Sequence, residues 1–343
     1  MKTALSTIFA MLALTLALPV SAQTSERLEQ SYQEKVQGDF VQKVKWERSF
    51  DAALARAKKE KKLVWAYFTR SYAPCPPCSA LESGPLLSEW WVKISTEFVP
   101  YLNINAKLDD KPDQKVPKAL NVVSYPFCVF VDVDGIILAE ARPESERAFR
   151  ESMGVAQAIV DIAGILARDP KNEAALAGKG LLTGMKAEPP ESLAALDKLA
   201  AVAGVDPRVL ARYKSYRYER PIADIFAAAR KGEFGKSPKE MTTRISQRLY
   251  KLWKDEKLTL PVEHRMAAPY YNYVVMGAID YKDKEGAQTA FELLKAAVEL
   301  LSPDLQTTAK SDLKIYEKQI EGLIQAENIR KNPKPDTRSA GRV

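Results

Sequence analysis

The sequence predicts an α/β domain, with a mixed central sheet flanked by helices, followed by an all-α C-terminal domain. Between residues 45 and 168, short runs of strand-forming residues alternate with helical segments, a pattern typical of α/β domains. From residue 169 onward the sequence is rich in Ala and Leu, with apolar residues at helical spacing and little strand signal. The 343 residues are enough for two ordinary domains.

The first domain, residues 45–168, is predicted to contain a helix, a strand, a helix, a strand, a short helix, a strand, a hairpin, a strand and a final helix. Leu63 to Phe68 is short, rich in strand formers and flanked by polar residues, which indicates a buried strand. Asp134-Gly135 is a strong hairpin turn signal. The other segments are helices at 46–62, from Cys75, at 86–98 and at 144–168, a helical turn at 116–120, and strands at 99–104, 127–131 and 136–139.

The second domain, residues 169–328, is predicted to be entirely helical. Its expected helices span 171–186, 191–203, 207–216, 221–231, 239–255, 263–280, 285–301 and 303–325. The stretch from Asp169 to Met185 resembles the start of a tetratricopeptide-type helical pair, although no second copy with matching spacing follows. Residues 329–343 are polar and basic with two prolines, which predicts a disordered tail.

The first residues have the pattern of a cleavable signal peptide. Lys2 supplies a positive start, Ala4 to Leu18 is uncharged and mostly apolar, and Val20-Ser21-Ala22 places small residues where a signal peptidase cuts. Cleavage is expected after Ala22. The apolar run is shorter than the ~20 residues of a membrane-spanning helix, which disfavours an anchor. The protein is therefore expected to be periplasmic or secreted, with residues 23–44 as a polar leader.

Composition excludes several other classes of protein. Charged residues make up 28% and hydrophobic residues 46%, the range of soluble globular proteins. The net charge of +7 is spread along the chain without a basic stripe interleaved with aromatics, so no nucleic-acid partner is expected. Three cysteines are too few for a disulfide-stapled scaffold.

Cys75 and Cys78 form a Cys-Pro-Pro-Cys motif at a predicted helix start. The helix terminus stabilises a thiolate on the first cysteine, which is the nucleophile in disulfide exchange, and the second thiol can then release the product. Cys75 is thus the expected attacking residue and Cys78 the resolving one. Neither central proline has an N–H, so backbone donors begin at Cys78.

Other uses of such a pair remain open on the residues alone. A zinc site needs two more ligands, and only Cys128 and the single histidine, His264, are candidates. Two thiolates also suit copper(I), and export permits an inert structural disulfide. Cys128 falls in a predicted core strand and is expected to be a buried thiol, with a third redox thiol as the alternative. His264 is expected to be structural or exposed. We expect no metal and no cofactor.

The stretch from Trp46 to about Ala141 resembles the thioredoxin superfamily, most closely its exported members with a Trp-led first helix. The resemblance rests on the strand at 63–68, the Cys-x-x-Cys after it, and Tyr125-Pro126 before a strand. It implies that Pro126 is the cis-proline of the family, packed against the disulfide and helping to hold polypeptide. Tyr125 and Pro74 are expected to contact the substrate.

The chain departs from that family at two positions. Ala73-Pro74 precede the first cysteine where the family has Trp, and the strand at 63–68 carries no counterpart of the family's buried acid. No histidine lies between the cysteines, unlike in the strongly oxidising relatives. Together with the two central prolines, this absence favours a reductase or isomerase-like poise.

The predicted function is an exported thiol–disulfide oxidoreductase acting on protein thiols and disulfides, with electrons from a membrane system if it works as a reductant. The alternative is a redox-inactive thioredoxin-fold scaffold or protein-binding module with a structural disulfide. The helical domain carries no acid–base cluster, phosphate loop or metal spacing. We expect it to be non-catalytic, to bind a protein partner and to hold that client for exchange.

Overall fold

The computed structural model describes residues 20–187, 191–264, 266–301 and 303–331 and divides into two compact units. The first unit comprises residues 1–183 and 198–210, and the second comprises 184–197 and 211–343. The predicted signal peptide lies outside the described residues except for its last three positions, and the predicted tail lies outside them from residue 332. None of the helices in the described ranges has the length and apolar character needed to cross a membrane.

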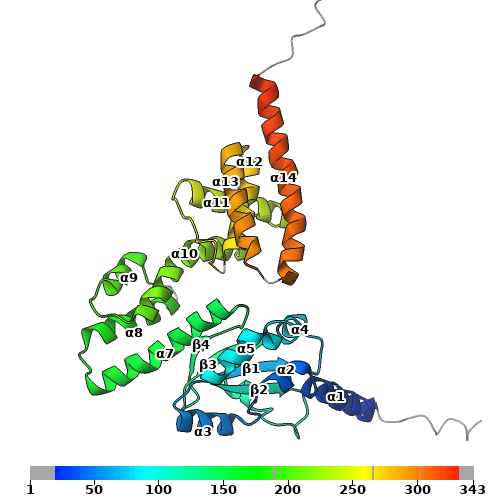
Figure 1. The fold of residues 1–343 in the computed structure, drawn as a ribbon, viewed down its shortest axis with the longest axis vertical. Coiled ribbons are helices and arrows are strands. Elements are labelled where there is room, and N and C mark those ends of the chain that lie inside the picture. Colours follow the sequence, from blue (N-terminus) through cyan, green and yellow to red (C-terminus); the bar gives the residue numbers. More distant parts are fainter. Residues whose placement is uncertain (1–19, 188–190, 265, 302, 332–343) are drawn as a thin grey trace, which may run out of the picture. The chain divides into compact units, whose positions relative to one another are not determined.

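A four-stranded mixed sheet forms the centre of the first unit (Figure 1). Its strand order is β2 (Val99–Asn105), β1 (Val64–Arg70), β3 (Phe127–Val131) and β4 (Ile137–Glu140). β1 pairs with β2 in parallel and with β3 antiparallel, and β4 pairs antiparallel with β3. A hairpin joins β3 to β4 at Gly135, whose φ of 81° lies in the left-handed region that glycine tolerates.

Alternation along β1 divides the core of this unit into two layers. Val64, Ala66 and Phe68 pack on one face with α3 (Phe50–Glu60) and α6 (Val116–Ala119). Trp65 and Tyr67 point to the other face and join a second cluster that includes side chains of α4 (Pro76–Ser83) and α7 (Glu146–Arg168). All of β1 except Arg70 is buried, as the sequence predicted for a strand covered on both faces.

Residues 23–44, predicted as a polar leader, form two helices that join this core. α1 spans Val20–Val36 and α2 spans Asp39–Lys43. Tyr32 and Phe40 are buried in the same cluster as Trp65. Tyr32 also accepts a hydrogen bond from Arg48 (3.1 Å) through its hydroxyl. Two aromatic anchors therefore suffice to fix a segment whose composition is otherwise polar.

The segment 86–98 differs from the single helix that the sequence predicted. It contains η1 (Pro85–Leu87), α5 (Glu89–Ile94) and η2 (Ser95–Glu97). Ser88 interrupts the run because its hydroxyl accepts a hydrogen bond from the Trp91 N–H (3.3 Å), which starts a new helix at Glu89. The break lets Leu86 and Trp91 both reach the core.

The remaining helices are α8 (Glu173–Lys186), α9 (Leu193–Ala200), α10 (Pro207–Arg230), α11 (Pro238–Lys254), α12 (Ala267–Asp280), α13 (Lys284–Glu299) and α14 (Pro303–Lys331). The sequence predicted two helices where α10 continues through Pro221. A proline inside a helix removes one backbone hydrogen bond. Here the buried side of the helix continues past it through Ile222, which belongs to the core of the second unit.

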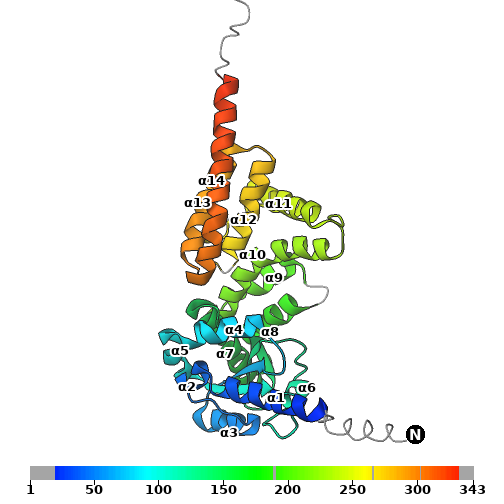
Figure 2. The same ribbon diagram turned by 90° about the vertical axis from the view of Figure 1, so that its right-hand side faces the viewer.

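The second unit packs α11, α12, α13 and α14 around one apolar core (Figure 2). α11 and α12 approach closely at Gly277, where an added Cβ would lie 2.4 Å from the Ser246 carbonyl oxygen and 2.5 Å from Tyr250 Cβ. Gly322 on α14 is different, because nothing outside its own helix lies within 4 Å of the corresponding position.

These two glycines predict opposite effects of the same substitution. We expect Gly277→Ala to lower the free energy of unfolding by about 1–3 kcal/mol, because the methyl group meets backbone that cannot move aside. Gly322→Ala should instead raise it by up to about 1 kcal/mol, because alanine is the better helix former. Urea denaturation of the two variants measures both values. Equal effects of the two substitutions would contradict the close α11–α12 packing.

Candidate functional site

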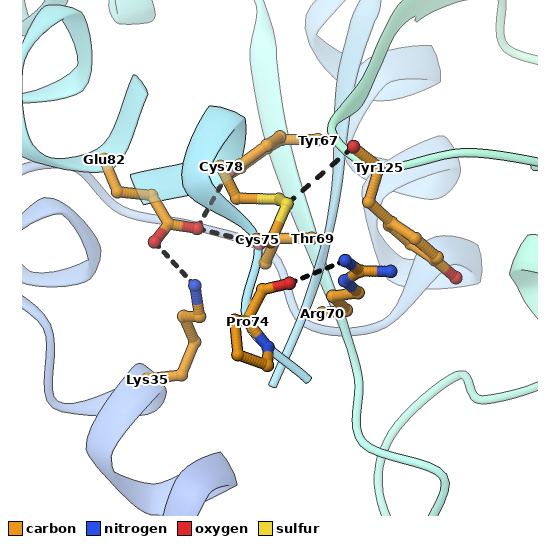
Figure 3. Close-up of a disulfide and its surroundings, with 9 residues drawn as sticks. All are labelled: Lys35, Tyr67, Thr69, Arg70, Pro74, Cys75, Cys78, Glu82 and Tyr125. Carbon is orange, nitrogen blue, oxygen red and sulfur yellow. Dashed lines mark hydrogen bonds and ion pairs between the residues drawn. A yellow bond between two sulfur atoms is a disulfide. The ribbon is translucent and has the colours of Figure 1, made fainter. Parts of the chain in front are cut away.

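The candidate site is a disulfide between Cys75 and Cys78 at the start of α4 (Figure 3). Cys75 is the N-cap residue of α4, and Cys78 occupies its first turn. The residue exposure is 6% for Cys75 and 0% for Cys78. Both cysteines are buried, and Cys75 is the one that keeps some exposure to solvent.

The two prolines leave few backbone donors at this helix start. Pro76 and Pro77 have no N–H, and the Ser79 N–H already donates to the Cys75 carbonyl (3.0 Å). This leaves the Cys78 N–H as the backbone donor of the first turn that can face the Cys75 sulfur. A Cys75 thiolate consequently receives less stabilisation than at a helix start with all its N–H groups free.

The Tyr125–Pro126 peptide bond is cis and lies beside the disulfide. The Tyr125 carbonyl oxygen is 3.7 Å from Cys75 Sγ. A sulfur in a disulfide carries no hydrogen, so this contact can become a hydrogen bond only when Cys75 is a thiol. The Tyr125 hydroxyl accepts a hydrogen bond from Asn105 Nδ2 (2.7 Å), and burial raises the pKa of Tyr125. Pro74 is exposed next to Cys75.

A largely buried carboxylate, that of Glu82, lies one helical turn beyond Cys78. Its Oε1 accepts hydrogen bonds from the hydroxyls of Tyr67 and Thr69 (both 2.8 Å), and its Oε2 is 2.6 Å from Lys35 Nζ. Tyr67 and Thr69 reach it together because alternate residues of β1 share a face. Figure 3 shows the carboxylate with its links to these partners. The i, i+4 spacing places both side chains on the sheet-facing side of α4.

Glu82 is largely shielded from solvent, and both of its carboxylate oxygens have partners. The side-chain exposure is 10% for Glu82 and 16% for Lys35. Burial, together with the charge of Glu82, raises the pKa of Tyr67 well above its usual value, so its hydroxyl remains a donor. A buried charge needs such partners because its desolvation is otherwise costly. Lys35 comes from α1, and the N-terminal helix is thereby part of the site.

In the thioredoxin superfamily, the expected position of the buried acid is the strand before the Cys-x-x-Cys motif, and β1 carries no acid. The carboxylate found here, that of Glu82, comes from α4 instead. The signal that would have found Glu82 is its spacing of four from Cys78, which predicts a shared helix face. No sequence signal indicated Lys35, because it is far from Cys78 along the chain and only tertiary packing brings it to Glu82.

Cys128 and His264 are the other two residues that the sequence offered as metal ligands. Cys128 is 2% exposed in β3, and burial raises the pKa of its thiol, as expected for a core cysteine. His264 lies 3.6 Å from Glu219, which also binds Arg212 (2.8 Å). Within the described residues, no group of three or more His, Cys, Asp or Glu side chains is arranged to hold a metal ion.

The Lys35–Glu82 pair predicts a specific loss of stability. We expect Lys35→Met to lower the free energy of unfolding by about 1–3 kcal/mol, because Glu82 then keeps a buried charge without its cation. Adding Glu82→Gln should recover part of the loss, because a neutral amide still accepts from Tyr67 and Thr69. Chemical denaturation measures all the values.

Arg147→Gln is the matched control, because Arg147 and Glu151 form an exposed pair and its loss should change stability by less than about 0.5 kcal/mol. If Lys35→Met cost no more than this control, the buried pair would not anchor α1.

No protein-family model matches the chain, and no curated protein does. A solved structure described as "DsbH Oxidoreductase" is 21% identical to the chain, with a TM-score of 0.28. The match covers 31% of this chain and 85% of that one. A TM-score this low leaves the disulfide and its surroundings as the basis for a functional assignment.

Proposed function

We propose that the protein is an exported thiol–disulfide oxidoreductase that exchanges disulfides with protein substrates through Cys75 and Cys78. The observation that carries the proposal is the asymmetry of the pair, with Cys75 at the helix start keeping a small exposure (6%) and Cys78 in the first turn having none. The strand, Cys-x-x-Cys helix and cis Tyr125–Pro126 around it form the arrangement that resembles the thioredoxin superfamily.

In the reducing direction, the reaction begins with the Cys75 thiolate. It attacks one sulfur of a substrate disulfide, which forms a mixed disulfide and releases the other substrate sulfur as a thiolate that takes up a proton. Cys78 then loses its proton and attacks the Cys75 sulfur. The second substrate thiol leaves, and two electrons have passed from the cysteine pair to the substrate.

Glu82 is the group that we assign to take the Cys78 proton. It is the only carboxylate on α4, it follows Cys78 by one turn, and it is held in place by Tyr67, Thr69 and Lys35. Tyr125 and Pro74 lie next to Cys75 and are the residues that we assign to contact the substrate chain.

The poise that we propose is that of a reductase or isomerase. The two prolines remove donors that would stabilise a Cys75 thiolate, and a less stable thiolate makes the pair a weaker oxidant. A reductant outside the cytoplasm needs a membrane-bound electron donor, which we propose as a partner. The helical unit is the proposed binding site for a protein client, which would raise the client's effective concentration.

Export itself is a separate prediction. We expect the protein recovered from the periplasm or medium of expressing cells to begin at Gln23, because Val20-Ser21-Ala22 suits signal peptidase. Intact-mass spectrometry measures this directly. A chain that retains residues 1–22 in the membrane fraction would contradict a cleaved signal.

The activity is tested by insulin reduction and by refolding of a scrambled disulfide substrate. We expect the mature protein to be active, Cys75→Ser to be inactive, and Cys78→Ala to accumulate mixed disulfides that mass spectrometry can identify. Glu82→Gln should slow release of the mixed disulfide at neutral pH but leave its formation unchanged.

Cys128→Ser is the matched control, because that thiol is buried in β3 and should not affect turnover. Activity that survives Cys75→Ser would contradict the proposal. A reduction potential of the Cys75–Cys78 pair below about −300 mV, together with no activity, would instead identify a structural disulfide and favour the scaffold alternative.

A further inference from the structure

A cluster of two cations and one aromatic ring lies at the edge of the sheet that carries the disulfide. It consists of Arg70, Tyr72 and Lys107, and we refer to it as the basic cluster. Arg70 ends β1 and pairs in register with Asn105, which ends β2. Because β1 and β2 are parallel, their carboxyl ends meet at one edge of the sheet. Tyr72 follows the end of β1 by two residues, and Lys107 follows the end of β2 by two residues.

The Tyr72 ring holds both cations. Lys107 Nζ is 4.3 Å and Arg70 Cζ is 5.7 Å from the ring centroid, within the range of cation–π attraction. The two side chains are thus positioned before any ligand arrives, which lowers the entropy lost when one binds.

Arg70 connects the cluster to the reactive sulfur. Its Nη2 donates to the carbonyl of Pro74 (2.6 Å), the residue directly before Cys75. Figure 3 shows the guanidinium between Pro74 and Tyr125, the two residues that border Cys75 Sγ. A substrate side chain that binds Arg70 therefore belongs to a residue only a few positions in the substrate sequence from the cysteine that Cys75 attacks.

The charges of the cluster are not neutralised by any part of the chain that the structure describes. Neither Arg70 nor Lys107 forms an ion pair with any residue that the structure describes, and Arg70 Nε has no hydrogen-bond partner among them. The contrast with the next lysine is informative. Lys111 pairs with Glu29 (2.6 Å) and with Asp110 (2.9 Å), one of two acids that follow Lys107 in the same loop.

We propose that the basic cluster binds acidic side chains next to the target cysteine of a polypeptide substrate. This rests on the proposed function. Two unpaired cations attract a carboxylate and repel a lysine or arginine at the same place, so the cluster selects substrates by charge. The attraction is exposed to solvent and is screened over ~8–10 Å at physiological salt, which confines selection to residues flanking the cysteine.

The test uses three peptides of equal length, each with one disulfide, whose flanking residues are Asp, Ser or Lys. Reduction by the fully reduced mature protein is followed as kcat/KM at low and high salt. We expect the Asp peptide to exceed the Ser peptide about tenfold at low salt and about twofold at 0.5 M salt. The Lys peptide should be the slowest at low salt.

Lys107→Asn should reduce the preference about threefold, because asparagine removes the charge and tolerates the left-handed backbone at this position, where φ is 56°. Lys107→Glu should abolish or reverse it. Arg70→Lys keeps the charge and should keep most of the preference. Lys58→Gln is the matched control, because Lys58 is an exposed cation in α3, which precedes the opposite end of β1.

The outcomes separate this proposal from the function on which it rests. Equal rates for the Asp and Ser peptides, or a preference that survives Lys107→Glu, would overturn the role of the cluster and leave the oxidoreductase standing. Failure to reduce any peptide would overturn both. Oxidised glutathione is the small-molecule substrate in this test. If its kcat/KM exceeded that of the Ser peptide by as much as the kcat/KM of the Asp peptide does, the assignment to polypeptide substrates would be overturned.

Discussion

The structure of the first unit depends on one strand that is hydrogen-bonded on both edges and covered on both faces. β1 pairs with β2 on one side and with β3 on the other, so its position fixes the whole sheet. Its alternation sends Val64, Ala66 and Phe68 to one apolar layer and Trp65 and Tyr67 to the other. The loop that follows β1 starts from this fixed strand and leads to Cys75 at the start of α4.

The carboxylate of Glu82 connects α4 and α1 to that strand. Glu82 on α4 is satisfied only when α1 supplies Lys35 and β1 presents Tyr67 and Thr69 on one face. Removing a charge from water costs several kcal/mol, so each of these contacts is needed once the carboxylate is buried. The same arrangement that stabilises the fold therefore fixes the position of Glu82, the group to which we assign proton transfer at Cys78.

The charged groups on the two sides of the disulfide differ in how they are neutralised. On the α4 side, the negative charge of Glu82 is matched by Lys35, and both side chains are largely shielded from solvent. At the edge where β1 and β2 end, Arg70 and Lys107 are stacked on Tyr72 and form no ion pair within the described part of the chain. In the function that we propose, the first side serves proton transfer at Cys78 and the second serves recognition of a charged partner.

The sequence by itself determined the elements whose signals are local. The strands at 63–68, 99–104 and 127–131 agree with β1, β2 and β3 to within two residues, because each is a short apolar run bounded by polar residues. Asp134-Gly135 located the hairpin, because only a turn with a residue at positive φ needs glycine there. The Cys75–Cys78 pair and the helix that it opens followed from spacing and from Pro76 at the first helical position.

Tertiary structure decided what depends on partners distant in sequence. The polar composition of residues 23–44 concealed the burial of Tyr32 and Phe40, because two anchors leave no periodic pattern. α10 continued through Pro221 because packing outweighs local preference. The partners of the Glu82 carboxylate, and the cluster of Arg70, Tyr72 and Lys107, became visible only when α1, β1 and β2 met. Electrostatic partnership depends on distance in space, and the sequence records only distance along the chain.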